Sequence, residues 1–211
     1  MPASTPISHS KTAALTRILD LIPRGYHQYT CGTVKAAKAI HLANKFHTLY
    51  RIGASPAQRL VRKRQGLANA LLVMYWPEGA EGVHWLLLVT DGTGLEAEHL
   101  RSVTDKPRLE WLGYELVRHA TRGRTSWTWR RPKVEMAEHY VLLDALVKQR
   151  HQSGIRAWLE RLANQPGFHG VRTQTWALCE ETRRRGYEGE LPFIYYVQKL
   201  SHGEPLALNT V

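Results

Sequence analysis

The pattern of apolar and polar positions predicts strands and helices in mixed order along the first 131 residues. Runs rich in aromatic and β-branched residues, bounded by turn residues, predict strands at 26–33, 68–76, 83–90, 110–119 and 125–131. Helical spacing of apolar residues, or a capping pattern, predicts helices at 11–21, 35–50, 56–65 and 93–101. Within this order lies the βαββαβ succession of a ferredoxin-like sheet, a scaffold that RNA-recognition domains also use.

After Pro132 the pattern becomes helical, with helices expected at 133–150, 155–163 and 173–185. Residues 193–200 are expected to form a final strand or an extended arm that crosses the domain. The strand at 83–89 is apolar on both faces, since Leu87 points one way while Leu86 and Leu88 point the other. Such strands are usually buried on both faces. We therefore expect the C-terminal helices to cover part of the second face of the sheet.

These elements predict an α+β protein with three segments. Residues 1–25 form a tail and a short helix, and residues 26–131 form a ferredoxin-like (RRM-like) nucleic-acid-binding core with an added β-hairpin strand. Residues 132–211 form a C-terminal helical extension with a final strand, packed on that core.

Composition narrows the class of partner. Lys and Arg total 29 against 18 Asp and Glu among 211 residues, which gives a net charge of +11 and a pI near 9.9. An excess of this size attracts polyanions. The two cysteines, Cys31 and Cys179, lie far apart without zinc-finger spacing, and we expect neither a metal nor a cofactor. The absence of a signal-peptide pattern and of long apolar runs predicts a cytoplasmic protein without a membrane partner.

The positive charge gathers in three segments, for which we predict contacts to nucleic acid. The first is a short basic helix, the second a hairpin in which arginine alternates with tryptophan, and the third the end of a helix. Arginine beside tryptophan can grip phosphates while the rings stack on bases. Alternatively, Trp127 and Trp129 share one face of a strand and belong to the core. The predicted contact residues are Arg59, Arg62, Lys63, Arg64, Arg118, Arg122, Arg124, Trp127, Trp129, Arg130, Arg131, Arg183, Arg184 and Arg185.

Catalytic signals are weaker than the basic ones. His27 and His84 fall on strands expected to be neighbours, where two histidines can hold a metal or one can act as a general base. Nickases that start rolling-circle replication use two histidines and a tyrosine on such a sheet. Tyr140 could be the nucleophile here, but the chain has no H-x-H in any strand and no lysine three residues after Tyr140. Polar side chains that only complete hydrogen bonds explain both histidines better than a catalytic role does.

Three functions are therefore compatible with the sequence. We expect a non-enzymatic nucleic-acid-binding protein, an accessory subunit of a bacterial replication, transfer or guide-RNA assembly. One alternative is a nuclease, either a metal-dependent nickase or a metal-independent endoribonuclease, that uses His27 and His84. Another is a protein-interaction subunit that docks through Trp111, Tyr195 and Tyr196.

Overall fold

The structure, a computed structural model, describes residues 7–121 and 124–197. It has the predicted α+β class and divides into two compact units, the first containing the described residues up to Pro107 and the second those from Arg108 onward. The sequence placed residues 108–131 with the core, whereas here they belong to the second unit. Among the described residues, no helix is long and apolar enough to cross a membrane.

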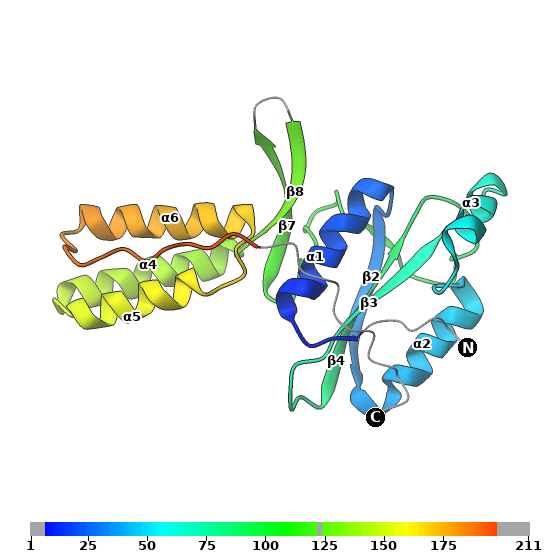
Figure 1. Cartoon of the computed structure of the whole chain (residues 1–211), viewed down its shortest axis with the longest axis horizontal. Coiled ribbons are helices and arrows are strands. Elements are labelled where there is room, and N and C mark those ends of the chain that lie inside the picture. Colours follow the sequence, from blue (N-terminus) through cyan, green and yellow to red (C-terminus); the bar gives the residue numbers. More distant parts are fainter. Residues whose placement is uncertain (1–6, 122–123, 198–211) are drawn as a thin grey trace. The chain divides into compact units, whose positions relative to one another are not determined.

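The first unit contains a five-stranded mixed sheet with the strand order β1-β3-β4-β2-β5 (Figure 1). Only β1 and β3 pair in parallel; the other neighbours are antiparallel. The strands are β1 (Ile7–Ser8), β2 (Gln28–Lys35), β3 (Ala70–Tyr75), β4 (Gly82–Val89) and β5 (Arg101–Ser102). The long central strands agree with the sequence prediction to within two residues at each end.

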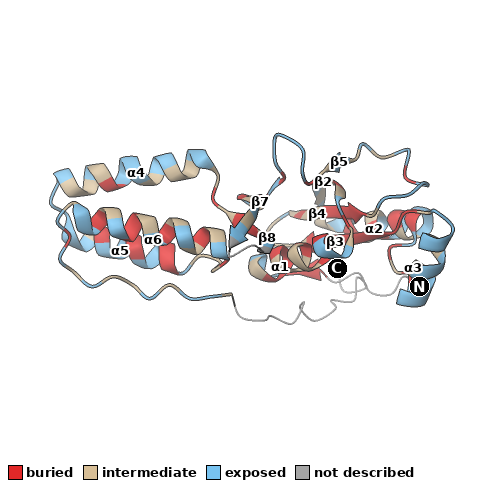
Figure 2. Ribbon diagram, turned by 90° about the horizontal axis from the view of Figure 1, so that it is seen from above, coloured by how far each residue is buried: buried red, intermediate tan, exposed pale blue. Residues whose placement is uncertain are grey.

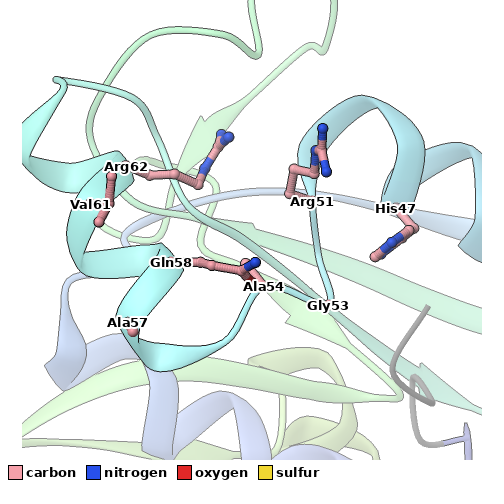
Figure 3. Close-up of a pocket in the computed structure, with 8 residues that line it drawn as sticks. All are labelled: His47, Arg51, Gly53, Ala54, Ala57, Gln58, Val61 and Arg62. Carbon is pink, nitrogen blue, oxygen red and sulfur yellow. The ribbon is translucent and has the colours of Figure 1, made fainter. Parts of the chain in front are cut away.

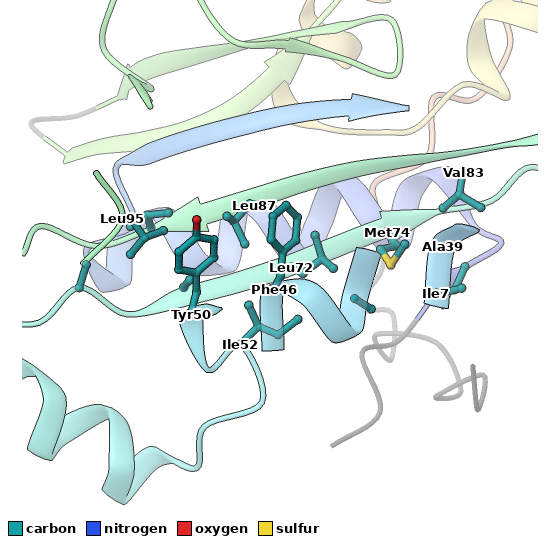
Figure 4. Packing of buried hydrophobic residues seen from close by; sticks show 14 residues of the cluster. Ile7, Ala39, Phe46, Tyr50, Ile52, Leu72, Met74, Val83, Leu87 and Leu95 are labelled. Atoms are coloured by element: carbon teal, nitrogen blue, oxygen red, sulfur yellow. The ribbon is translucent and has the colours of Figure 1, made fainter. Parts of the chain in front are cut away.

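Helix α2 (Ala36–Tyr50) covers one face of this sheet. Its Phe46 and Tyr50 pack onto Leu72 and Leu87 of the two central strands (Figure 4). Gly32 of β2 allows the indole of Trp85 to lie across the strand, since a Cβ there would be 2.9 Å from the ring. The ring of Trp85 then meets Phe46 edge-on at 5.5 Å. This cluster is the apolar core on that face.

Helix α1 (Lys11–Leu21) packs against β3, and a short 3-10 turn (Ile22–Arg24) follows it. Leu15 and Ile18 of α1 are fully buried but do not belong to the apolar core that α2 covers. Leu86 and Leu88 of β4 are likewise buried outside that core. The alternation of strand residues places those two leucines on the face opposite α2. Burial of β4 on both faces is confirmed, and α1 packs on its neighbour β3. Cover of the second face by the C-terminal helices stays a prediction.

The ferredoxin-like arrangement is not confirmed. The pairing order β5-β2-β4-β3 is what such a sheet would have, but residues 90–100 form turns instead of the predicted helix at 93–101. Gly92 and Gly94 have φ angles of 139° and 102°, which a helix cannot contain. The backbone of Thr93 instead exchanges hydrogen bonds of 3.0 Å with Gly66 and Ala68.

The second unit has its own sheet, formed by β6 (Glu110–Trp111), β7 (Tyr114–Thr121) and β8 (Arg124–Arg130) in that order. The hairpin was expected to extend the main sheet and instead pairs only with β6. The predicted strand at 110–119 is interrupted by a two-residue turn, in which Leu112 and Gly113 have φ angles of 52° and 82°. Positive φ at both central residues is the geometry of a tight type I′ hairpin turn.

Three helices complete the second unit: α4 (Lys133–Lys148), α5 (Gln152–Ala163) and α6 (His169–Arg184). Their core holds Leu143, Trp158 and Leu178, and α6 packs on β8. A Cβ on Gly170 would lie 2.5 Å from the carbonyl oxygen of Trp129, so only glycine allows this approach. Of the predicted strand at 193–200, residues 193–197 are not in a strand and 198–200 lie outside the described residues.

Replacement of Gly92 by alanine should destabilise the first unit more than replacement of Gly94. Both residues have positive φ, but a Cβ on Gly92 would also lie 2.5 Å from the backbone nitrogen of Ala68, whereas nothing lies within 4 Å of one on Gly94. We expect a loss of about 3 kcal/mol for Gly92→Ala and about 1 kcal/mol for Gly94→Ala in urea unfolding. Equal losses would show that the close approach does not constrain the turn.

Candidate nucleic-acid interface

Helix α3 (Pro56–Arg64) carries four cations and buries none of its residues. It begins with a capping box, in which the Ser55 hydroxyl accepts from the Gln58 amide at 3.3 Å and the Gln58 side chain accepts from the Ser55 amide at 2.8 Å. The basic residues of its last turn interact favourably with the helix dipole. Figure 2 draws the helix largely in the colour of exposed residues. Local capping, and not an apolar face, therefore stabilises α3.

The four cations of α3 divide into two kinds. Arg59 donates from Nε to the Ala54 carbonyl at 2.9 Å, and Arg62 donates from Nη2 to the Ala68 carbonyl at 2.8 Å. The first bond is local, since Ala54 lies just before the helix, and the second ties the helix to the segment that leads into β3. Lys63 and Arg64 are exposed and make no ion pair with any residue that the structure describes.

Further positive charge lies beside Arg59. Burial lowers the pKa of Arg17, and the nearby Arg59 and Arg24 lower it further, with Asp20 acting in the opposite direction. The arginines of α1, of the turn after it and of α3 therefore repel one another in the unbound protein. A bound anion would relieve that repulsion.

A pocket of about 630 Å³ opens between the end of α2 and α3 (Figure 3). His47 and Arg51 lie on the α2 side, and Gln58 and Arg62 lie on the α3 side. None of the described residues that line it is acidic; the other lining residues are Gly53, Ala54, Ala57 and Val61. The sequence prediction found Arg62 in this group but missed His47 and Arg51, because the helical pattern at 35–50 assigns no role to the residue that ends the helix.

The second predicted cluster, on the hairpin, is only partly realised. The Arg118 guanidinium lies 4.9 Å from the ring centre of the half-buried Trp127, which leaves this pair at the surface. Trp129 is fully buried, so for this residue the core assignment is the correct one. Arg122 lies outside the described residues, and Arg124 is described only as a backbone position of β8.

Arg131 contradicts the prediction that it binds nucleic acid. Its side chain has no exposed surface and donates to Gln165 at 2.6 Å, to the Val171 carbonyl at 3.1 Å and to Thr175 at 2.9 Å. Glu135 lies 3.8 Å away and compensates part of the charge. Burial lowers the pKa of Arg131. This guanidinium joins β8 to α6 and cannot reach a phosphate.

Several other predicted contact residues of the second unit form ion pairs or hydrogen bonds within the protein. Arg130 pairs with Glu115 at 2.8 Å. Arg184 and Arg185 both pair with Glu181, and Arg185 also reaches Asp144 at 3.2 Å. Arg183 donates to the carbonyl of Tyr187 at 2.8 Å. The arginines of the third basic cluster are thus largely engaged in ion pairs and a backbone hydrogen bond at the C-terminal end of α6.

The structure separates the predicted catalytic residues. β2 and β4 are neighbours, but Thr33 pairs with His84 while His27 precedes the first residue of β2. About six residues of extended chain, or roughly 20 Å, lie between the two histidines. His84 bonds to Thr33 at 3.2 Å and stacks on Tyr75, which fits the structural interpretation. Tyr140 belongs to α4 in the second unit. Within the described part of the chain, no group of three His, Cys, Asp or Glu side chains is arranged to hold a metal ion.

An aromatic surface in the second unit was predicted only in part. Tyr195 and Tyr196 are 63% and 69% exposed, as the docking alternative expected, whereas Trp111 is buried. Trp176 and Phe193 join the two tyrosines on this surface, which borders a cavity of about 420 Å³. The Arg172 guanidinium lies 3.2 Å from the ring centre of Tyr196.

Comparison with known proteins adds no family assignment. No family model, curated protein or solved structure matches the chain.

Removal of the Arg131 side chain tests its structural role. Arg131→Met leaves the acceptors on Gln165, Val171 and Thr175 without their donor, and we expect the free energy of unfolding of the second unit to fall by about 3 kcal/mol. Arg118→Met is the control, because it removes an exposed arginine of the same sheet and should cost less than about 0.5 kcal/mol. Comparable losses in urea unfolding would refute the assignment.

Acidification should destabilise the second unit through His169 at the start of α6. Partial burial lowers the pKa of His169 below 6.5, and His119, whose ring centre is 3.8 Å away, and Arg172 lower it further. The folded state thus binds this proton more weakly than the unfolded state, so stability is full above pH 6.5 and falls as the pH drops through the lowered pKa.

The pH dependence of thermal unfolding measures this effect. His169→Gln should reduce the loss of stability below pH 6.5, while His151→Gln, which replaces an exposed histidine before α5, should preserve it. An unchanged pH profile in His169→Gln would exclude this histidine as the cause.

Proposed function

We propose that the protein is a non-enzymatic nucleic-acid-binding protein whose principal contact surface is α3 and the adjoining end of α2. The observation that carries the proposal is a basic helix that buries no residue, ends in two exposed cations without described ion-pair partners, and borders a pocket lined by no acid. Unpaired, accessible cations are what phosphates require, because paired cations would first have to lose their acidic partner.

The second unit contributes to the proposal at one point. Arg118 over Trp127 offers a cation and a half-buried ring next to each other, which suits a phosphate and its base. Among the other predicted contact residues of that unit whose side chains are described, Arg131 is buried, Arg183 bonds to a backbone carbonyl, and Arg130, Arg184 and Arg185 are paired with acids. On this proposal the protein has an accessory role in a replication, transfer or guide-RNA assembly, since the predicted catalytic residues His27 and His84 lie apart in the structure.

The exposed aromatic surface of the second unit favours a second candidate function, the docking of a partner protein. Its rings, Trp176, Phe193, Tyr195 and Tyr196, are each more than half exposed. Aromatic residues are enriched at protein interfaces. Trp176→Ala together with Tyr195→Ala should release a partner that stays bound after nuclease treatment. Retention of that partner by the double variant would exclude this surface.

Substitution of the two exposed cations tests the proposed function. The double variant Lys63→Gln, Arg64→Gln should bind labelled single-stranded DNA, duplex DNA or RNA about tenfold more weakly or worse. Its slope of log affinity against log salt should be smaller by about 1.5, because about two phosphate contacts are lost. Fluorescence anisotropy across a salt series measures both quantities.

Arg156→Gln, Arg184→Gln is the matched control. It removes the same charge from two exposed arginines that pair with Glu160 and Glu181. It should change affinity by less than about threefold and leave the salt slope within about 0.5, since paired cations release few counterions. Equal effects of the two double variants would show that net charge, and not α3, determines binding. A parent protein whose binding does not respond to salt would refute the proposed function.

A further inference from the structure

We propose that the pocket between α2 and α3 binds the terminal phosphate of a nucleic-acid strand. This inference rests on the proposed function and adds a specific ligand group to it. It starts from the lining of the pocket, which contains two guanidinium groups and one imidazole and no acidic side chain. Figure 3 shows these basic side chains on the two opposite walls.

The charge of the pocket matches a phosphomonoester better than an internal phosphodiester. A terminal phosphate carries close to two negative charges at neutral pH, whereas a diester carries one. Arg51 and Arg62 come from different elements and supply one positive charge each. His47 adds a ring that can donate a hydrogen bond. Charge-assisted bonds of this kind are the strongest that phosphate oxygens form.

The shape of the pocket suits the end of a strand. A volume of about 630 Å³ lies within the range of small-molecule sites, which corresponds to one nucleotide and not to a longer segment. Ala54, Ala57 and Val61 provide small apolar surfaces on which a sugar can rest. The outer surface of α3 is convex and exposed and suits internal phosphates, whereas the concave pocket accepts a chain end.

Two nitrogens of the lining residues lack hydrogen-bond partners. Nδ1 of His47 and Nε of Arg62 are buried and bond to no atom in the described structure. Native proteins leave few buried polar groups unsatisfied, and each such group calls for an explanation. A phosphate oxygen brought into the pocket would supply an acceptor after a small rotation of either side chain.

The backbone of Arg51 gives an independent indication. Arg51 ends α2 in the left-handed conformation, with φ of 56° and ψ of 41°. Helices commonly place glycine in this conformation, because any side chain there is strained. The chain instead places an arginine there, and its side chain lines the pocket. Strained positions of this kind concentrate at binding sites.

This conformation makes Arg51→Gly the decisive variant. Glycine relieves the strain, so the variant should fold with an unchanged or higher midpoint of thermal unfolding while it loses the guanidinium. Arg150→Gly is the matched control, because Arg150 is an exposed arginine with φ of 49° after α4. It removes the same charge from the same backbone conformation in the other unit.

The test compares oligonucleotides of one sequence, labelled internally, that carry a 5′-phosphate, a 3′-phosphate or hydroxyl groups at both ends. The parent protein and Arg150→Gly should bind one phosphorylated form about tenfold more tightly than the hydroxyl form. Arg51→Gly should bind all three forms with equal affinity, because the group that distinguishes a terminal phosphate from a hydroxyl is lost.

The remaining outcomes separate this inference from the proposed function. Equal binding of all three forms by the parent protein overturns the pocket inference and leaves nucleic-acid binding intact. The same holds if Arg51→Gly retains the preference. If the parent protein binds none of the oligonucleotides, both the proposed function and the pocket inference are wrong. If a nucleoside monophosphate binds the parent as tightly as the preferred oligonucleotide, the pocket is a site for free nucleotides, and the strand-end assignment is wrong.

Discussion

Strand β4 is buried on both faces, and the positions of the helices in the first unit follow from this constraint. α2 covers the face that carries Leu87, and α1 lies against β3 on the side of Leu86 and Leu88. α3 buries none of its residues against this sheet. Its capping box and two arginine bonds to backbone carbonyls hold it instead. The basic helix α3 is therefore exposed to solvent next to the basic pocket between α2 and α3.

The two units treat positive charge differently. In the second unit the fold uses arginine as a structural group, since Arg131 is buried among hydrogen-bond acceptors and Arg185 bridges Glu181 and Asp144. Along α3 the terminal cations have no described acidic neighbour. The net charge of +11 is thus a poor guide to the size of a phosphate-binding surface. The size of that surface depends on how many cations have no acidic partner within the fold.

Local sequence signals predicted the elements that local physics determines. The N-cap at Ser55 with proline after it, and the apolar runs of β3 and β4, appear in the structure as expected. The helix expected at 93–101 failed because the backbone angles of Gly92 and Gly94 and the bonds to Gly66 and Ala68 override a weak capping pattern. The burial of Arg131 could not be read from the chain, since its partners lie 34 or more residues away. The role of Arg51 was equally hidden, because it depends on φ at the end of a helix.

The central claim is that unpaired cations of α3, and not the overall charge, meet the nucleic acid. Lysine footprinting with an amine-reactive reagent tests this claim most directly, because Lys63 and Lys148 are both exposed but only Lys148 pairs with a described acid, Asp144, at 2.6 Å. Addition of a saturating oligonucleotide should protect Lys63 from modification and leave Lys148 as reactive as before. Equal reactivity of Lys63 with and without the oligonucleotide, under conditions where the protein is bound, would contradict the account.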